Sequence, residues 1–299
     1  MKKSNTTSAT MRGKVSSEME IEQLVTKAVQ GSKEALEEIV SRIQESVYSL
    51  SLRMLLNPED AADAAQEILI TVITNLQGYR FEGPFRAWVL RIAVNKLKAV
   101  RKTYAEKKMS SVGNLDEIID RYEARGWFSK PLDAPEPYLE VETRAVCTHA
   151  LLLSLNRSHR VAFILGVVMG VSTQEGAQIL DITPAAYRKR LSRARSRIKD
   201  FLAKNCGLLN DSNRCRCKSI LPAYLQKGWI DPNKPIFVSK NSNVESPTKL
   251  GTYLKELDEL KQISAIYRSV TPPNFDFVEV VKNIYKNDQY RIISDPQAT

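Results

Sequence analysis

Residues 172–197 read STQEGAQILDITPAAYRKRLSRARSR and carry the start signals of two consecutive helices. Ser172 and Glu175 form an S-x-x-E capping box, which marks the first turn of a helix. Thr183 is a good N-cap for a second helix, and Pro184 follows at the first helical position, where no backbone N–H is needed. Because only a tight turn separates the two signals, the stretch predicts a helix-turn-helix.

The second of these helices is densely basic on one side. Tyr187, Leu191 and Ala194 recur at helical spacing and are expected to form its inner face. The outer face carries five basic residues and a serine, namely Arg188, Lys189, Ser192, Arg193, Arg195 and Arg197. Such a helix enters a DNA major groove by its N-terminal half, while later arginines contact phosphates. A solvated charged face is the simpler alternative. The coincidence of charge with the capping box, the turn and the Thr-Pro restart favours DNA binding.

Composition limits the class of protein. The length of 299 residues suggests about two domains. A net charge of +10 and a pI near 9.3 favour a polyanionic partner. The N-terminus lacks the apolar core of a signal peptide, and the longest apolar run, residues 161–171, is too short to span a bilayer. We therefore expect a cytoplasmic protein with no membrane partner, in which the four cysteines are thiols or metal ligands.

Helical periodicity dominates residues 18–204 and strand signals are scarce, so we expect an all-α fold. Asn57, followed by proline, predicts the start of a helix whose first turns are acidic. Asp60, Asp63 and Glu67 are spaced so that they share one exposed face of that helix. Taken alone, this face is explained by helix-dipole complementation and solvation.

A second basic segment follows the acidic helix. Residues 86–108 hold eight basic residues and one acidic residue, which predicts another nucleic-acid-binding face. Four aromatic residues lie beside this segment and could stack on bases, namely Tyr79, Phe81, Phe85 and Trp88. The alternative for Phe85 and Trp88 is a place in the core. For Trp88 a place in the core is the favoured interpretation.

Four stretches, taken in order, resemble bacterial RNA polymerase sigma factors of the extracytoplasmic-function (ECF) group. They are NPEDAADAAQEI, FEGPFRAWVLRIAVNKL, LLLSLNRSHRVAFIL and GVSTQEGAQILDITPAAYRKRLSRAR. The resemblance covers about residues 20–103 and 143–204. It implies two small helical domains joined by a linker, which bind core RNA polymerase, recognise the −35 and −10 promoter elements and initiate transcription. It also allows an anti-sigma factor as a partner.

The resemblance assigns a partner to each surface. The acidic helix would dock on the clamp helices of the largest catalytic subunit of polymerase, through Asp60, Asp63, Gln66 and Glu67. The −10 element would be bound by an aromatic ring, an amide and four basic residues, namely Phe81, Asn95, Lys96, Lys98, Arg101 and Lys102. The −35 element would be bound by Arg188, Lys189, Arg190, Ser192, Arg193, Arg195 and Arg197. Of these, Arg190, Arg195 and Arg197 would mainly add salt-dependent affinity.

Three residues of the helix-turn-helix depart from the family pattern. Gly176 stands where a larger apolar residue is usual, Asp181 where the turn normally has glycine, and Tyr187 where a small β-branched residue is usual. These departures leave the −35 sequence open.

The predicted domain order is as follows: a disordered tail at 1–17, sigma region 2 at 18–103, a linker at 104–142, sigma region 4 at 143–204, a cysteine-containing segment at 205–217, and a small, mostly helical C-terminal extension at 218–299. A helix is expected near residues 253–267 of the extension. One hypothesis gives the extension a regulatory role, controlling access to polymerase or DNA, and another makes it a docking surface for a different protein.

Cys206, Cys215 and Cys217 lie within twelve residues directly after the basic helix. Three thiols at this spacing are compatible with a zinc site, which would need a fourth ligand. Cys147 or His149 could supply that ligand only if the fold brings one of them close. Thiol redox sensing and no role at all stay open as alternatives. A sigma factor itself requires no cofactor.

Two other functions compete with the sigma factor. A conventional helix-turn-helix regulator would bind duplex DNA as a dimer, but this leaves the acidic helix and residues 81–102 unexplained. A nucleic-acid-processing enzyme could use Asp60, Asp63 and Glu67 to hold a metal ion. The sequence contains no P-loop, H-E-x-x-H or G-x-S-x-G motif and only two histidines. We therefore expect a protein that is not an enzyme.

Overall fold

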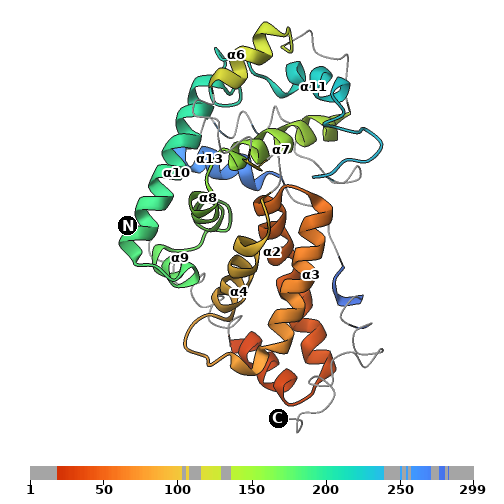
Figure 1. The fold of residues 1–299 in the computed structure, drawn as a ribbon, viewed down its shortest axis with the longest axis vertical. Helices are drawn as coiled ribbons and strands as arrows, with labels where there is room; N and C mark the ends of the chain where they lie inside the picture. The colour runs from red at the N-terminus through yellow and green to blue at the C-terminus, as the bar shows by residue number, and fades with distance from the viewer. Residues whose placement is uncertain are drawn as a thin grey trace, which may run out of the picture. The chain divides into compact units, whose positions relative to one another are not determined.

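The computed structural model describes residues 19–102, 106–107, 116–128, 136–238, 250, 254, 257–270, 276–279 and 282. The described chain is helical and contains no strand, which confirms the expected all-α class (Figure 1). It divides into two compact units. The N-terminal unit holds residues up to Val100 and those from Asn274 onward, together with 178–181, and the helix-turn-helix unit holds most of the chain between them. The predicted disordered tail lies outside the described residues.

The N-terminal unit begins, in its described part, with helical residues 19–29. The longer helices that follow are α2 (Lys33–Leu55), α3 (Pro58–Thr74) and α4 (Phe85–Ala99), with a 3-10 turn η1 (Leu76–Gly78) between the last two. The start of α3 is capped as predicted, because Asn57 Oδ1 accepts hydrogen bonds from the backbone N–H groups of Glu59 and Asp60 at 2.8 and 3.0 Å.

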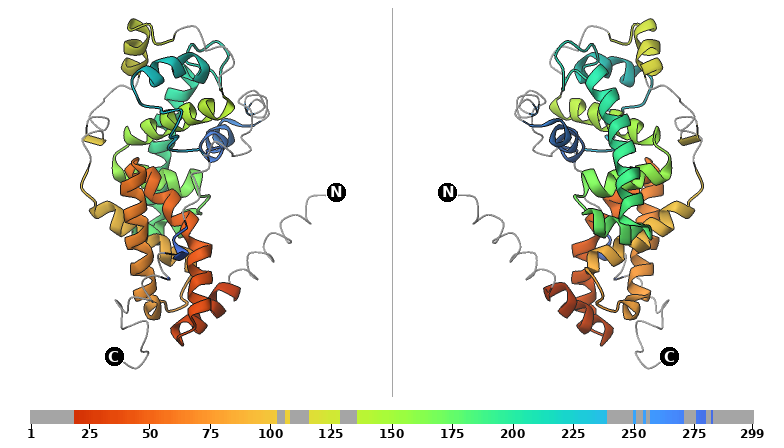
Figure 2. Two further views of the ribbon diagram at one scale, coloured as in Figure 1. Left: turned by 90° about the vertical axis from the view of Figure 1, so that its right-hand side faces the viewer. Right: turned by 90° about the vertical axis from the view of Figure 1, so that its left-hand side faces the viewer.

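The three helices α2, α3 and α4 pack against one another, as both views of Figure 2 show. Each contributes an apolar stripe to a shared core, in which Ile39, Ile68 and Leu90 are fully buried. Phe277, from the C-terminal segment of the chain, packs on this unit. Its backbone N–H donates to Gln44 Oε1 at 2.8 Å, and its ring lies 6.1 Å from the ring of Tyr48.

The helix-turn-helix unit is built around one long helix. Its elements are α6 (Asp116–Ala124), α7 (Pro137–Leu153), α8 (Arg157–Phe163), a π-helical turn η2 (Ile164–Val168), most of α9 (Thr173–Leu180), α10 (Pro184–Asn205), α11 (Cys217–Gln226) and α13 (Glu259–Arg268). The long helix α10 packs on α8, and α11 packs on α7. Figure 1 shows α6 near the C-terminal end of α10.

Part of the predicted linker is packed into this unit. Asp116 at the start of α6 accepts hydrogen bonds from Lys204 Nζ at 2.5 Å and from Asn205 Nδ2 at 2.7 Å, both at the end of α10. The carboxylate of Glu106 forms a two-pronged ion pair with Arg157, in which both N···O distances are 2.7 Å. A sequence rich in turn signals gave no sign of these long-range partners.

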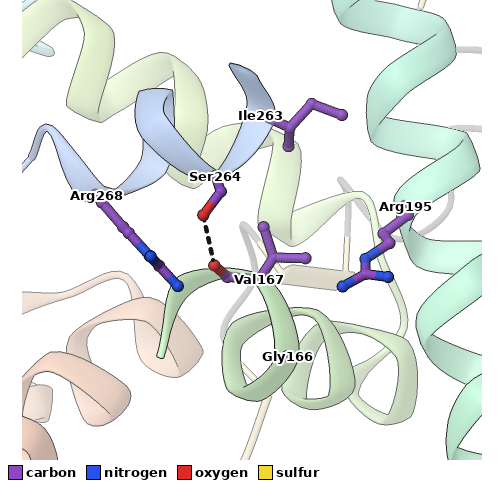
Figure 3. A pocket seen from close by; sticks show the side chains of 6 residues that line it. All are labelled: Gly166, Val167, Arg195, Ile263, Ser264 and Arg268. Carbon is purple, nitrogen blue, oxygen red and sulfur yellow. Dashed lines mark hydrogen bonds between the residues drawn. The ribbon is translucent and has the colours of Figure 1, made fainter. Parts of the chain in front are cut away.

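The C-terminal extension also packs on the helix-turn-helix unit. The helix α13 runs from Glu259 to Arg268, and Asp258 supplies its N-cap. Residue 253, where the predicted helix begins, lies outside the described residues. Ser264 Oγ donates to the carbonyl oxygen of Val167 at 2.9 Å (Figure 3), and Arg268 Nε donates to that of Val168 at 2.8 Å. The extension therefore covers the π-helical turn η2.

None of the helices described here is long and apolar enough to cross a membrane.

Candidate nucleic-acid interface

The helix-turn-helix forms with the predicted caps. Ser172 Oγ accepts a hydrogen bond from the backbone N–H of Glu175, and Thr183 Oγ1 accepts one from that of Ala186, both at 3.2 Å. Asp181 adopts a left-handed backbone conformation, with φ of 54°, in the turn between α9 and α10. Aspartate tolerates this conformation better than most residues. The turn therefore forms without the usual glycine.

Two of the departures from the family pattern compensate for each other. A Cβ atom added to Gly176 would lie 2.3 Å from Cζ of the Tyr187 ring, which is closer than any real contact. The Tyr187 ring is fully buried, and its hydroxyl group donates to the carbonyl oxygen of Ala162 at 3.4 Å. The large ring on α10 thus occupies the space that the missing side chain on α9 leaves free.

The predicted −35 residues of α10 fall into two groups. Those on the outer face are exposed and comprise Arg188, Lys189, Ser192 and Arg193. The others are half-buried and comprise Arg190, Arg195 and Arg197. Arg195 lines a small cavity beside Gly166 on η2 and Arg268 on α13 (Figure 3). The four exposed side chains, at the N-terminal half of α10, are the ones placed to reach base edges.

The positive field of α10 also acts on a neighbouring histidine. Burial and the charges of Arg193 and Arg190 lower the pKa of His159. His159 is therefore neutral at physiological pH, and it adds no positive charge of its own to this surface.

The acidic residues of α3 lie on one exposed face. Asp60, Asp63, Gln66 and Glu67 are all exposed, whereas Ala61, Ala65, Ile68 and Leu69 on the opposite side are buried. Within the described chain, no three His, Cys, Asp or Glu side chains are placed to share a metal ion.

An aromatic cluster precedes the basic face of α4. Phe81 has a left-handed backbone, with φ of 57°, and its side chain is 48% exposed. Its ring lies 4.7 Å from that of Tyr79, whose hydroxyl group donates to the carbonyl oxygen of Gly83 at 2.6 Å. Phe85 is buried, and half-buried Trp88 stacks against it. A strained backbone thus presents Phe81 outward from a rigid aromatic base.

The remaining predicted −10 residues follow along and just after α4. They are all exposed and comprise Asn95, Lys96, Lys98, Arg101 and Lys102. Val94 and Leu97 on the same helix are buried, so the polar residues share the solvent side. The structure thus gives α4 a basic exposed face.

Sequence reasoning missed a buried ion pair that supports the DNA-binding helices. Arg160 is fully buried, and its Nη1 lies 3.3 Å from Oε1 of Glu106. Its Nε and Nη2 atoms donate to the carbonyl oxygens of Leu152 and Leu155 at 2.9 and 3.0 Å, which satisfies the end of α7. Arg160 directly precedes the apolar run 161–171, in the polar stretch NRSHR, and nothing in that local sequence indicates its buried partner.

Two known protein families match this chain, one in each unit. The chain matches Sigma-70 region 2 over residues 39–105 and Sigma-70 region 4 over residues 145–198.

Individual relatives of this chain are ECF RNA polymerase sigma factors. The ECF RNA polymerase sigma factor ShbA of Streptomyces griseus is 30% identical over 188 residues, covering 59% of this chain and 92% of the relative. The ECF RNA polymerase sigma-E factor of Escherichia coli is 30% identical over 175 residues, covering 58% of this chain and 90% of the relative. SigE of Mycolicibacterium smegmatis is 28% identical, and the chain spans only 65% of its length.

Among solved structures, CnrH in complex with the cytosolic domain of CnrY is 21% identical. That match covers 60% of this chain and 94% of CnrH, with a TM-score of 0.43. Relatives that are 30% identical over nine tenths of their length, together with matches to both sigma regions, show that this chain belongs to the extracytoplasmic-function sigma factors of RNA polymerase.

Proposed function

We propose that the chain acts as an alternative sigma factor in the cytoplasm, with a separate surface for each partner. The exposed face of α3 binds the clamp helices of the largest polymerase subunit. The loop at Phe81 and the basic face of α4 bind the −10 element, and the exposed N-terminal half of α10 reads the −35 element. The chain has no catalytic role of its own, because promoter opening draws on strand capture and polymerase contacts.

The observation that carries this proposal is the segregation of charge between two helices of the N-terminal unit. In α3 the exposed side is acidic, and in α4 the exposed side is basic. A basic surface favours the DNA backbone, whereas an acidic surface repels it and requires a different partner. A protein that only binds duplex DNA does not explain the acidic face.

The −10 site combines a stacking platform with an amide. Phe81 is half-exposed and held above Tyr79, which makes it able to stack on an unpaired base. Asn95 on α4 is exposed and offers both a donor and an acceptor for a base edge. Lys96, Lys98 and Arg101 would contact phosphates of the captured strand.

Reversing the charge of the α3 face is expected to abolish polymerase binding. In the variant Asp60→Lys/Asp63→Lys, two exposed carboxylates become ammonium groups, so attraction to a basic partner surface turns into repulsion. Affinity for core RNA polymerase, measured by fluorescence anisotropy of the labelled chain, should fall at least tenfold. The matched control is Glu45→Lys/Asp120→Lys, which makes the same net charge change at exposed sites on α2 and α6. Equal loss in both variants would contradict a docking site on α3.

Removing a base-reading side chain from α10 is expected to cost sequence discrimination. For Arg188→Ala or Arg193→Ala, we expect a loss of about 1–3 kcal/mol at the −35 element, because each exposed guanidinium can pair with a guanine. Promoter binding by the reconstituted holoenzyme should weaken on the preferred −35 sequence and change little on a scrambled one. A uniform loss on both sequences would instead assign these arginines to phosphate contacts.

We also propose that the C-terminal extension regulates the helix-turn-helix unit, since α13 covers η2, which directly precedes α9. A truncation after Val238 removes α13 and keeps residues 236–238, whose backbone N–H groups bind the buried carboxylate of Glu142. We expect the truncated chain to remain folded but to change promoter-specific transcription. Unchanged transcription at equal folded concentration would rule out a regulatory role for the removed residues.

A further inference from the structure

All four cysteines of the chain gather in the helix-turn-helix unit. Cys147 lies in α7, Cys206 ends α10, Cys215 lies in the following loop, and Cys217 begins α11. Cys206 and Cys215 pair as an isolated β-bridge, and the N–H of Gly207 donates to the carbonyl oxygen of Cys215 at 2.9 Å. The fold therefore places the backbones of Cys206 and Cys215 side by side.

Cys147 reaches the same region from α7, which packs on α11, the helix that begins at Cys217. Burial, together with Cys215, Cys206 and Cys217, raises the pKa of the Cys147 thiol. By contrast His149, the other residue the sequence offered as a fourth ligand, stacks on Phe237 with ring centroids 4.2 Å apart. The structure thus favours cysteine over histidine as the fourth member.

Polar groups of the loop after α10 surround the cluster. The backbone N–H groups of Leu209 and Asn210 donate to the carbonyl oxygen of Cys206 at 3.2 and 3.1 Å, so the chain turns tightly at this cysteine. The positive charges of Arg144 and Arg216 act on the sulfur of Cys206. Arg216 is held in place by a hydrogen bond from Nη1 to the carbonyl oxygen of Gly207 at 2.9 Å. Two cations would offset the net double negative charge of four thiolates around one divalent metal ion.

We propose that Cys147, Cys206, Cys215 and Cys217 form a four-thiolate site for a thiophilic divalent cation, with zinc as the best match. Tetrahedral sets of four cysteines are typical of structural zinc sites, and thiolates select zinc over magnesium or calcium. In the described chain the side chains are not close enough as they stand for three to share an ion. Formation of the site therefore requires the cysteine side chains to move, and rotation to another staggered rotamer is the smallest such change.

The proposed site would join three elements around the end of the DNA-reading helix. It links Cys206, the C-cap residue of α10, to α7 and to the first turn of α11. These two helices also share a small apolar cluster of Leu139, Ile220, Leu221, Tyr224 and Ile230. Metal binding would therefore stabilise the helix-turn-helix unit. This inference does not depend on the polymerase-binding proposal.

The test uses the full chain, purified under reducing conditions and titrated with Zn²⁺ and separately with Co²⁺. We expect one zinc per chain, a Co²⁺ spectrum with the thiolate charge-transfer intensity of four sulfur ligands, and a lower melting temperature after chelation. Cys147→Ser should reduce that intensity by about a quarter, while the control His149→Gln should leave metal content unchanged.

Three results would overturn the proposal. One is the absence of stoichiometric zinc in the reduced wild-type chain. Another is an unchanged Co²⁺ spectrum in Cys147→Ser, which excludes Cys147 as a ligand. The third is rapid formation of a Cys206–Cys215 disulfide with peroxide in a chain that binds no zinc, which assigns the cluster to redox chemistry. The zinc content is measured on the wild-type chain, so this result tests the proposal even if a cysteine variant fails to fold.

Discussion

Replacing Gly176 by alanine is expected to destabilise the helix-turn-helix unit by about 2–3 kcal/mol, because overpacking a close-packed core costs about this much. Helix propensity alone predicts the opposite sign, a gain of about 1 kcal/mol for glycine to alanine in a helix. The steric term should win, because the added Cβ would lie 2.3 Å from the Tyr187 ring, and that ring is 0% exposed. Urea denaturation of the wild type and the variant measures the difference.

A double-mutant cycle separates this contact from general disruption. Tyr187→Val alone should destabilise by about 3 kcal/mol, because it leaves a cavity beside Gly176. The pair Gly176→Ala/Tyr187→Val should be destabilised less than the sum of the single changes, by at least about 1 kcal/mol, since the new methyl group fills part of that cavity. Additive effects, or a stabilising Gly176→Ala, would show that the two residues do not compensate.

Removing the carboxylate of Glu106 is expected to have a larger effect. Glu106 is 3% exposed and binds Arg157 through two contacts of 2.7 Å, with fully buried Arg160 beside it. Glu106→Ala would leave the Arg160 charge buried without its carboxylate, which costs about 3–5 kcal/mol. Thermal unfolding should show the loss, whereas the control Glu117→Ala, at an exposed position on α6, should unfold almost as the wild type does.

The same ion pair predicts a pH dependence. Burial alone raises the pKa of Glu106, but Arg157 and Arg160 outweigh it and hold the pKa below the usual 4.5. A carboxyl group with a lowered pKa stabilises the fold at pH values above its ordinary value, and the stabilisation disappears as pH falls from there toward the folded-state pKa. The wild-type melting temperature should therefore fall below pH 4.5. If Glu106→Gln shows the same acid dependence, other groups are responsible.

Local signals in the sequence predict the helix-turn-helix well, because caps and turns depend on neighbouring residues. The hydroxyl groups of Ser172 and Thr183 and the side chain of Asn57 accept the expected hydrogen bonds. The exposed faces of α3 and α10 also follow from helical spacing, since the period of a helix fixes which residues share a side.

Long-range pairs could not be predicted in this way. Gly176 and Tyr187 each depart from the family pattern when considered alone, and only their contact in space explains both. Glu106 lies 51 residues before Arg157, in a segment whose composition is typical of a linker. Cys147 joins the cysteine cluster through the packing of α7 on α11, which no spacing in the sequence reveals.

The extension illustrates the same limit. Periodicity predicts a helix near its middle, but not that Ser264 and Arg268 bind the carbonyl oxygens of η2. Nor does the composition of residues 231–238 indicate that their backbone N–H groups surround the buried carboxylate of Glu142. Such contacts depend on side chains meeting across about a hundred residues of chain.

Run-off transcription with purified core RNA polymerase, on a library of promoter fragments, tests the central claim most directly. Transcripts that start at defined sites only when this chain is present, and that disappear with Asp60→Lys/Asp63→Lys, are the predicted result. The truncation after Val238 would be assayed in parallel, so that inhibition by the extension does not hide activity. Silence from both forms, with tight binding to palindromic duplex DNA in the absence of polymerase, would contradict the account and indicate a conventional helix-turn-helix regulator.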